Sequence, residues 1–232
     1  MDTAMAMAMA FMVMPTMSKM VVKQFGHVLR DFLKDYKVIT NSQLVLKRGF
    51  DVVLSCLVLP VVLFPILVLV LVASIDTQQF GLFSQDRIGQ YGQVFKIFKL
   101  RTLKAGTHQL GHLKVSATRL GQFLRVSKID ELPQLFNVLI GNMSFVGPRP
   151  DVKGFADQLQ GEDRMILKVK PGITGPATLK YKNEEALLSQ QADPETYNRT
   201  IIWADKIEIN KKYVQNWSFS LDLYFITKSI RN

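Results

Sequence analysis

The chain has 232 residues and a formal net charge of +10, from 29 Lys and Arg against 19 Asp and Glu. This basic excess indicates a polyanionic partner, either nucleic acid, anionic lipid or a phosphorylated substrate, without choosing among them. The single cysteine, Cys56, excludes an internal disulfide framework. The length is sufficient for one sizeable domain together with a membrane anchor.

Residues 1–46 are predicted to form an N-terminal extension that carries one amphipathic helix. The first twenty residues are rich in Met and Ala and lack the positive charge that begins a secretory signal. Residues 21–37 show apolar side chains at helical spacing with Lys and Arg between them. Two interpretations fit this helix equally: it lies on an anionic membrane, or it packs on its own domain.

A long apolar run follows, and residues 47–76 are predicted to form a membrane segment. The 24 consecutive uncharged residues at 52–75 would reach about 36 Å as a straight helix, and a hydrocarbon core is about 30 Å thick. However, Pro60 and Pro65 predict a bend. Lys and Arg also stand on both sides of the run, which is typical of the cytoplasmic face. A re-entrant hairpin satisfies both flanks and is favoured over a single span.

The stretch from Arg87 to Lys128 contains nine Lys and Arg and no Asp or Glu. A solvated surface normally mixes charges of both signs, so this stretch predicts an anionic ligand. Within it, residues 94–101 are predicted to form a strand leading into a turn, with Lys99 and Arg101 presented to phosphates. No recognisable nucleic-acid-binding module accompanies the basic residues, so we expect no nucleic-acid partner.

Two adjacent carboxylates, Asp130 and Glu131, come directly after this stretch. Because proline is favoured in the first turn of a helix, Pro133 predicts a helix that begins near Asp130. At a helix N-terminus both carboxylates should stay ionised, beside a position where a phosphate can dock. Two acids also suit Mg²⁺, which prefers carboxylate and phosphate oxygens. Taken alone, the pair is better explained by ordinary helix capping.

Pro148 and Pro150 bracket Arg149 in the next segment. The prolines stiffen the backbone and Gly147 permits its close approach to a ligand, so Arg149 is interpreted as a clamp for phosphate. The alternative is a structural turn whose arginine pairs with a neighbouring carboxylate.

Weaker patterns occur elsewhere in the chain. His108 and His112 have the spacing of a helical metal pair, although nearby glycines favour a solvated loop. Residues 203–217 are predicted to be helical, and residues 219–230 to form a second amphipathic helix suited to a membrane interface.

Six short motifs occur in a fixed order along most of the chain. They are KRGFD at 47–51, FSQDRIG at 83–89, FKIFKLRT at 95–102, KIDELPQLFN at 128–137, MSFVGPRP at 143–150 and KPGITG at 170–175. Any one of them is weak, whereas six in this order are highly specific. Through them the chain resembles the bacterial sugar transferases that act on polyprenyl phosphate, the monotopic phosphoglycosyl transferases.

The resemblance implies a helix-rich α/β fold, in which a re-entrant membrane helix hairpin precedes a cytoplasmic catalytic domain at residues 77–232 with interfacial amphipathic helices. It implies a location in the bacterial inner membrane with the catalytic domain on the cytoplasmic face. The implied reaction transfers a sugar 1-phosphate from a UDP-sugar to undecaprenyl phosphate and uses Mg²⁺. This is the first membrane step of surface polysaccharide (exopolysaccharide or capsule) or glycoconjugate assembly, and pairing into a homodimer is compatible with it.

The resemblance also implies roles for individual residues. Asp130 is the expected nucleophile, which forms a covalent phosphosugar-aspartyl intermediate, and Glu131 is its catalytic neighbour. Both are expected to hold Mg²⁺. The residues expected to bind the phosphates or the rest of the substrate are Lys99, Arg101, Arg125, Pro148 and Arg149.

The chain departs from the family pattern at two places. Phe64-Pro65 stands where many members have Ser-Pro, and Pro176 stands where many have Trp. The second departure predicts a different pocket or donor. Two other classes of function stay open at this stage: a basic membrane-surface binder without catalysis, and a nucleic-acid-binding protein with a membrane anchor.

Overall fold

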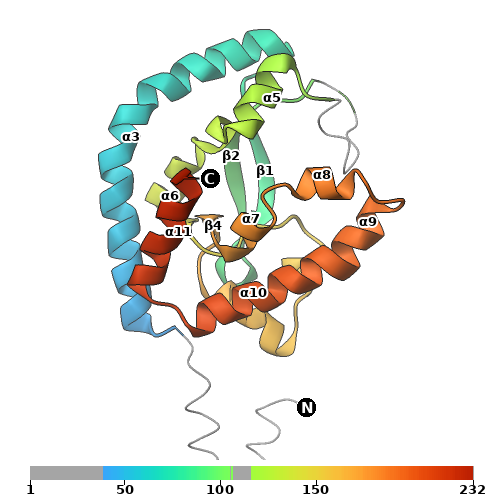
Figure 1. Ribbon diagram of the computed structural model, residues 1–232. Helices are drawn as coiled ribbons and strands as arrows, with labels where there is room; N and C mark the ends of the chain where they lie inside the picture. Colours follow the sequence, from blue (N-terminus) through green and yellow to red (C-terminus); the bar gives the residue numbers. More distant parts are fainter. Residues whose placement is uncertain (1–38, 105, 107–115, 232) are drawn as a thin grey trace, which may run out of the picture.

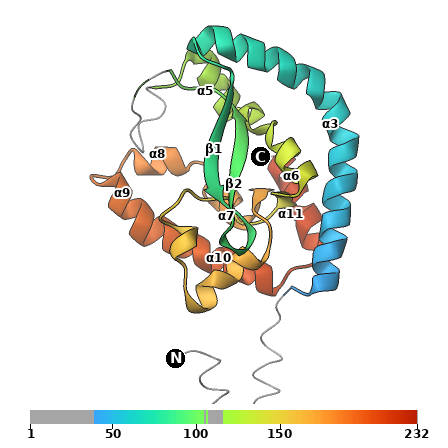
Figure 2. The ribbon, with the colours of Figure 1, turned by 180° about the vertical axis from the view of Figure 1, so that it is seen from behind.

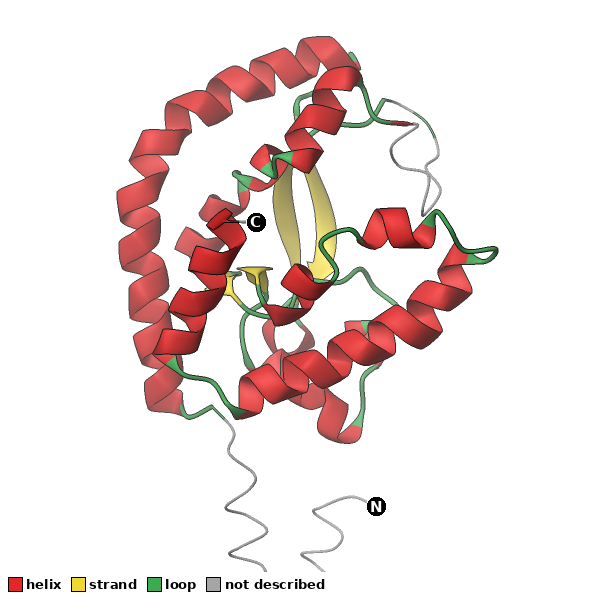
Figure 3. Cartoon of the chain, in the orientation of Figure 1, coloured by secondary structure: helices red, strands yellow, loops and turns green. Residues whose placement is uncertain are grey.

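The computed structural model describes residues 39–104, 106 and 116–231. The predicted helix at 21–37 and the pair His108 and His112 lie outside the described residues. The structure confirms a helix-rich α/β fold, in which helices surround two small sheets (Figure 3).

The elements follow one another in a simple order. The N-terminal half contains α3 (Asn41–Thr77), β1 (Leu82–Ile88), the 3₁₀ turn η2 (Gln90–Gly92), β2 (Val94–Leu100), α5 (Arg119–Val126), η3 (Ile129–Glu131) and α6 (Gln134–Ile140). The C-terminal half contains β3 (Ser144–Val146), η4 (Ala156–Gln158), η5 (Gly161–Lys168), β4 (Gly172–Thr174), α7 (Pro176–Lys180), α8 (Glu184–Leu188), α9 (Pro194–Tyr197), the π-helical η6 (Asn198–Ile202), α10 (Trp203–Gln215) and α11 (Phe219–Arg231).

The helix α3 includes the whole predicted membrane segment. It begins after Thr40, whose side chain and backbone exchange hydrogen bonds with Gln43 in a capping box. Pro60 and Pro65 lie inside it, and α3 forms one bowed helix around one side of the molecule in both views (Figures 1 and 2). Within the described part of the chain, α3 is the one helix long and apolar enough to cross a membrane.

The N-terminal part of α3 is fastened to the domain by a buried polar network, called here the anchor cluster. Its members are Lys47, Asp51, Tyr213, Trp217 and Asp222. Lys47 Nζ lies 2.5 Å from Asp222 Oδ2, and Asp222 also accepts hydrogen bonds from Tyr213 and Trp217. Asp51 Oδ1 accepts from the Ser144 hydroxyl and the Phe145 amide. The first motif, KRGFD, is therefore a structural clamp.

The C-terminal part of α3 is fastened to the same domain. The hydroxyl of Thr118, which caps α5, donates to the carboxylate of Asp76. The Gly81 amide donates to the Ser74 hydroxyl at 2.7 Å. A straight helix of 37 residues would separate its ends by about 55 Å. In this structure both ends reach one globular body, because the helix is bowed between them.

The antiparallel pair β1 and β2 runs from Leu82 opposite Leu100 to Ile88 opposite Val94. The strand predicted from the alternating apolar and basic residues is thus confirmed. Asn137 of α6 ties this pair to the next element, because its amide receives a hydrogen bond from the Phe98 backbone and donates one to the Lys96 carbonyl. This contact fixes α6, and the turn before it, against the strand that carries Lys99.

The parallel pair β3 and β4 joins the two glycine-containing motifs. A Cβ at Gly172 would lie 2.1 Å from the Gly147 nitrogen, and one at Gly175 would lie 2.4 Å from the Gly147 oxygen. Side chains cannot occupy such spaces, so glycine is required for the backbones to pack directly on each other. This contact sets the position of the loop that follows Gly147 and carries Arg149.

The helices predicted at 203–217 and 219–230 are present as α10 and α11. Both contribute to the core: Tyr213, Val214 and Trp217 pack with Val146 and Met165, and α11 covers this cluster. Figure 1 shows α11, α6 and α5 along the inner side of the bowed α3.

Candidate active site

The two carboxylates lie in a tight turn between helices. After α5, Lys128 adopts a left-handed backbone with φ of 59°, and Asp130 and Glu131 then form the 3₁₀ turn η3. The helix α6 begins only at Gln134. A helical turn thus begins near Asp130, as predicted, but it is the 3₁₀ turn η3, and the α-helix that Pro133 was expected to open starts only at Gln134. The pair does not stand in the first turn of α6.

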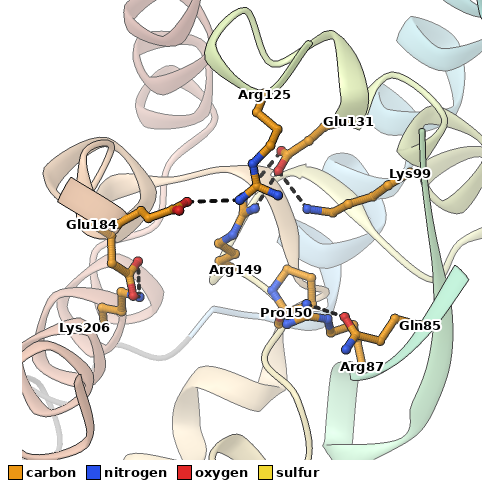
Figure 4. Close-up of polar contacts among 10 residues, drawn as sticks. Gln85, Arg87, Lys99, Arg125, Glu131, Arg149, Pro150, Glu184 and Lys206 are labelled. Atoms are coloured by element: carbon orange, nitrogen blue, oxygen red, sulfur yellow. Dashed lines mark hydrogen bonds and ion pairs between the residues drawn. The ribbon is translucent and has the colours of Figure 1, made fainter. Parts of the chain in front are cut away.

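Glu131 is held by two cations (Figure 4). Its Oε1 accepts hydrogen bonds from Lys99 Nζ at 2.9 Å and from Arg149 Nη2 at 2.5 Å. Burial alone would raise the pKa of Glu131, but Arg149 and Lys99 outweigh it and hold the pKa well below its usual range. Glu131 is thus ionised, as predicted, and is committed to these two ion pairs.

Asp130, in contrast to Glu131, lacks a hydrogen-bond partner among the described residues for one of its carboxylate oxygens. It is 6% exposed, and the oxygen without a partner in this part of the chain is the buried Oδ1. Burial raises the pKa of Asp130, and the neighbouring Glu131 raises it further, while Lys99 and Arg125 oppose the shift. The helix-start argument predicted an effect in the other direction. A buried carboxylate oxygen without a partner is costly, which is typical of a functional group rather than a structural one.

The two cations on Glu131 come from distant elements. Lys99 is the penultimate residue of β2, and Arg149 follows β3 on the glycine-packed loop. Burial lowers the pKa of Lys99 to about 8, and the charge of Arg149 adds to the effect. The carbonyl of Pro148 accepts a hydrogen bond from the Gly172 amide at 2.8 Å. Pro148 therefore helps to hold the loop in place through its backbone.

Arg125, on α5, lies close enough to Asp130 for its charge to act on that carboxyl group. Its Nη2 donates to Glu185 Oε2 at 3.1 Å. Together these residues form what is called here the catalytic cluster: Lys99, Arg125, Asp130, Glu131 and Arg149. The sequence predicted all five.

Arg101 was predicted to join this site, and the structure places its contacts elsewhere. Its Nε donates to the Phe80 carbonyl at 2.8 Å, and its guanidinium lies over the Phe83 ring, 5.4 Å from the centroid. The strand β2 ends at Leu100, so Arg101 no longer follows the alternation that aims Lys99 at Glu131.

Sequence reasoning missed the acidic rim of the site. Glu184 on α8 pairs with Lys206 of α10 at 2.7 Å, next to the pair formed by Glu185 and Arg125 (Figure 4). Burial raises the pKa of Asp151 to about 7, although Lys206 and Arg87 oppose the shift. These contacts join segments far apart in the chain, so no local pattern in the sequence predicts them.

The fit of Mg²⁺ depends on which oxygens are available. The described residues contain no group of three or more His, Cys, Asp or Glu that could hold a metal. Mg²⁺ is, however, often held by one or two carboxylates together with substrate phosphates. The oxygens of Glu131 face two cations, whereas the buried Oδ1 of Asp130 has no hydrogen-bond partner among the described residues. Of the two carboxylates, Asp130 would be the one available to Mg²⁺ beside phosphate oxygens, and Glu131 would be the poorer ligand.

The profile of a family described as "Bacterial sugar transferase" matches residues 42–232. The chain is 35% identical over 195 residues to "Uncharacterized sugar transferase EpsL" of Bacillus subtilis, which covers 81% of this chain and 87% of that protein.

Two further relatives carry more detailed names. The chain is 34% identical over 196 residues to "UDP-N-acetylgalactosamine-undecaprenyl-phosphate N-acetylgalactosaminephosphotransferase" of Aeromonas hydrophila, which covers 80% of this chain and 43% of that protein. It is 34% identical over 199 residues to "UDP-glucose:undecaprenyl-phosphate glucose-1-phosphate transferase" of Klebsiella pneumoniae, which covers 81% of this chain and 40% of that protein. The chain thus spans less than half the length of these two relatives.

Proposed function

The chain belongs to the bacterial sugar transferase family, and from this premise we propose that it transfers a sugar 1-phosphate from a UDP-sugar to undecaprenyl phosphate. The names of two relatives support this reaction. Because these relatives have the same identity to the chain and are named for different sugars, we assign the donor only as a UDP-sugar. The lipid-linked product would begin the assembly of a surface polysaccharide or glycoconjugate.

One observation carries the chemistry, namely the contrast between two neighbouring carboxylates. Glu131 is neutralised by Lys99 and Arg149, while Oδ1 of Asp130 has no partner among the described residues. A carboxylate engaged in two ion pairs is a poor nucleophile, and an open one keeps its lone pairs for attack. Asp130 is therefore the nucleophile in this proposal, and Glu131 positions Lys99 and Arg149.

The proposed reaction has two steps. A carboxylate oxygen of Asp130 bonds to the phosphorus that carries the sugar, the bond from that phosphorus to the UMP oxygen breaks, and UMP leaves. An oxygen of undecaprenyl phosphate then attacks the same phosphorus, and the bond to Asp130 breaks. The product is a lipid-linked diphosphate sugar, and the carboxylate of Asp130 is regenerated. Arg125, Arg149 and Lys99 stabilise negative charge on the transferring phosphoryl group.

We propose Mg²⁺ as the cofactor, with Asp130 and the donor phosphates as its ligands. When bound, it would reduce the negative charge of the diphosphate, so that an anionic nucleophile can approach phosphorus. The residues of this chain supply the rest, because Lys99 and Arg149 place a second layer of positive charge behind Glu131.

For the membrane we propose that α3 enters and leaves on the same face. The attachment of its two ends to one domain supports this, and so do the basic flanks that are typical of the cytoplasmic side. Exposed apolar side chains continue this surface on α5, α6 and α11, among them Val126, Ile140 and Ile230. The catalytic domain would then face the cytoplasm at the inner membrane. Pairing into a homodimer stays a prediction.

Trapping the intermediate tests the proposal. The protein is incubated with Mg²⁺ and a UDP-sugar labelled at the β-phosphate, without acceptor, and the label on the protein is measured. We expect label on Asp130, release of UMP, and neither with Asp130→Asn. Asp86→Asn is the matched control, because Asp86 forms only an exposed pair with Lys96.

Label on a different residue would contradict the assignment of the nucleophile. Binding to anionic vesicles without release of UMP, over a panel of UDP-sugars, would favour a membrane-surface binder instead. The same panel identifies the sugar.

A further inference from the structure

Two cations meet at the glycine that ends α6. A Cβ at Gly141 would lie 3.1 Å from Lys170 Nζ and 3.3 Å from Arg48 Nη2, so the ammonium and guanidinium groups are close neighbours. Arg48 is fixed there, because its terminal nitrogens donate to the carbonyls of Val138 and Leu139. Like charges at such a separation repel each other, and an anion placed between them would relieve the repulsion.

Lys170 has no hydrogen bond or ion pair with any described residue. Burial lowers its pKa, and the charge of Arg48 lowers it further, while Asp51 opposes the shift. Asp51 is a weak counter-ion for this lysine, because its Oδ1 already accepts two hydrogen bonds, from Ser144 and Phe145. The positive charge of the pair is therefore not matched by a carboxylate in contact with it among the described residues.

The surroundings of the pair are open and apolar. Val45 lies one turn before Arg48 on the same face of α3 and is 72% exposed, and Ile140 beside Gly141 is 62% exposed. A Cβ at Gly49 would meet nothing within 4 Å, so the surface of α3 next to Arg48 is bare. Figure 1 shows that α6 lies next to α3, along the inner side of the bowed helix.

We propose that Arg48 and Lys170 bind the phosphate of an anionic membrane phospholipid, whose acyl chains lie along Val45 and Ile140. The arginine retains N–H donors beyond the two hydrogen bonds it makes, and the lysine adds an unpaired point charge. A free phosphate would match the charge but would leave the apolar side chains exposed to water, so the lipid is the better occupant. This inference rests on the membrane placement proposed above.

The test uses the full chain in nanodiscs made of equal parts phosphatidylglycerol and phosphatidylcholine. Native mass spectrometry then measures the lipid that stays bound when the protein is released. We expect the wild type to retain phosphatidylglycerol in preference to phosphatidylcholine. Lys170→Gln should lower this retention about fivefold, the effect typical of one basic residue near an anionic surface. Lys168→Gln, at an exposed lysine two residues away, should not lower it.

Equal retention of phosphatidylglycerol by the wild type and Lys170→Gln would overturn the inference. So would an equal preference for the two lipids, or displacement of the lipid by millimolar inorganic phosphate, which would identify a site for free phosphate. Turnover in the same nanodiscs separates the two proposals. Turnover without lipid retention overturns only the lipid site, and lipid retention without turnover overturns only the proposed transferase activity.

Discussion

The anchor cluster and the catalytic cluster are both buried groups of charges, and they differ in how completely their hydrogen bonds are satisfied. In the anchor cluster, both oxygens of Asp222 accept hydrogen bonds, from Lys47, Tyr213 and Trp217. In the catalytic cluster, Glu131 is equally well satisfied, but Oδ1 of Asp130 is left open among the described residues. A complete network fixes structure, whereas an incomplete one keeps a group ready for substrate at a cost in stability.

The largest expected effect is on Asp130. Asp130→Asn should reduce turnover by about 10⁴-fold or more, because it removes the nucleophile. The same change should leave the melting temperature unchanged or raise it, because a buried carboxylate that lacks a partner is lost. Steady-state release of UMP and thermal unfolding in detergent measure the two effects. A variant that is inactive only because it unfolds would contradict the comparison.

The opposite pattern is expected in the anchor cluster. Asp222→Asn leaves the buried charge of Lys47 without its counter-ion and should destabilise the protein by about 3–5 kcal/mol. Thermal unfolding measures this loss, with Asp86→Asn as a control, since an exposed pair is worth less than about 1 kcal/mol. Replacing both partners, Lys47→Met with Asp222→Leu, should recover only the part of the loss that comes from the unpaired Lys47 charge, because Tyr213 and Trp217 also lose their acceptor. A melting temperature of Asp222→Asn equal to that of the wild type would show that the anchor cluster does not hold α3.

Lys99 and Arg101 form a matched pair for the next prediction, because both are basic and only two positions apart. Lys99→Met should lower turnover by about 10²-fold, since a cation that stabilises the transferring phosphoryl group is removed. Arg101→Met should have little effect, because its contacts are with Phe80 and Phe83. Turnover measured at saturating donor distinguishes them, and equal losses would argue that Arg101 moves into the site when substrate binds.

The smallest expected effect concerns pH. Because burial raises the pKa of Asp130 and the nucleophile must be ionised, activity should fall on acidification at a higher pH than for an ordinary aspartate. Arg125 opposes this shift, so Arg125→Met should move the acidic limb of the profile of kcat/KM to still higher pH. Arg119→Met, at the exposed start of the same helix, should leave it in place. A limb that moves downward in Arg125→Met would refute the electrostatic role.

Local patterns predicted much of the fold. The apolar run predicted α3, the alternating residues predicted β2, and the C-terminal periodicity predicted α10 and α11, because each depends on neighbouring residues alone. The anchor cluster could not be predicted, since Lys47 and Asp222 are 175 positions apart. The same holds for Glu184 and Lys206, whose pairing depends on how α8 and α10 pack.

The catalytic cluster shows a finer limit. Its five residues were predicted, one of them, Arg125, through the family resemblance alone, but the different roles of Asp130 and Glu131 were not. That difference depends on which carboxylate Lys99 and Arg149 reach, and this follows from the glycine contact that positions the Arg149 loop. Spacing along the sequence carries no information on that contact.

The bowed helix α3 has a further consequence for the membrane. Both ends of α3 are attached to one domain. The protein itself would therefore limit how deeply the bowed part of α3 can enter the bilayer. The height of Asp130 above the lipid headgroups would then be set by the protein and not by the thickness of the bilayer. With α3 entering and leaving on one face, as proposed above, the enzyme would contact only the near leaflet and should work equally well in thin and thick membranes.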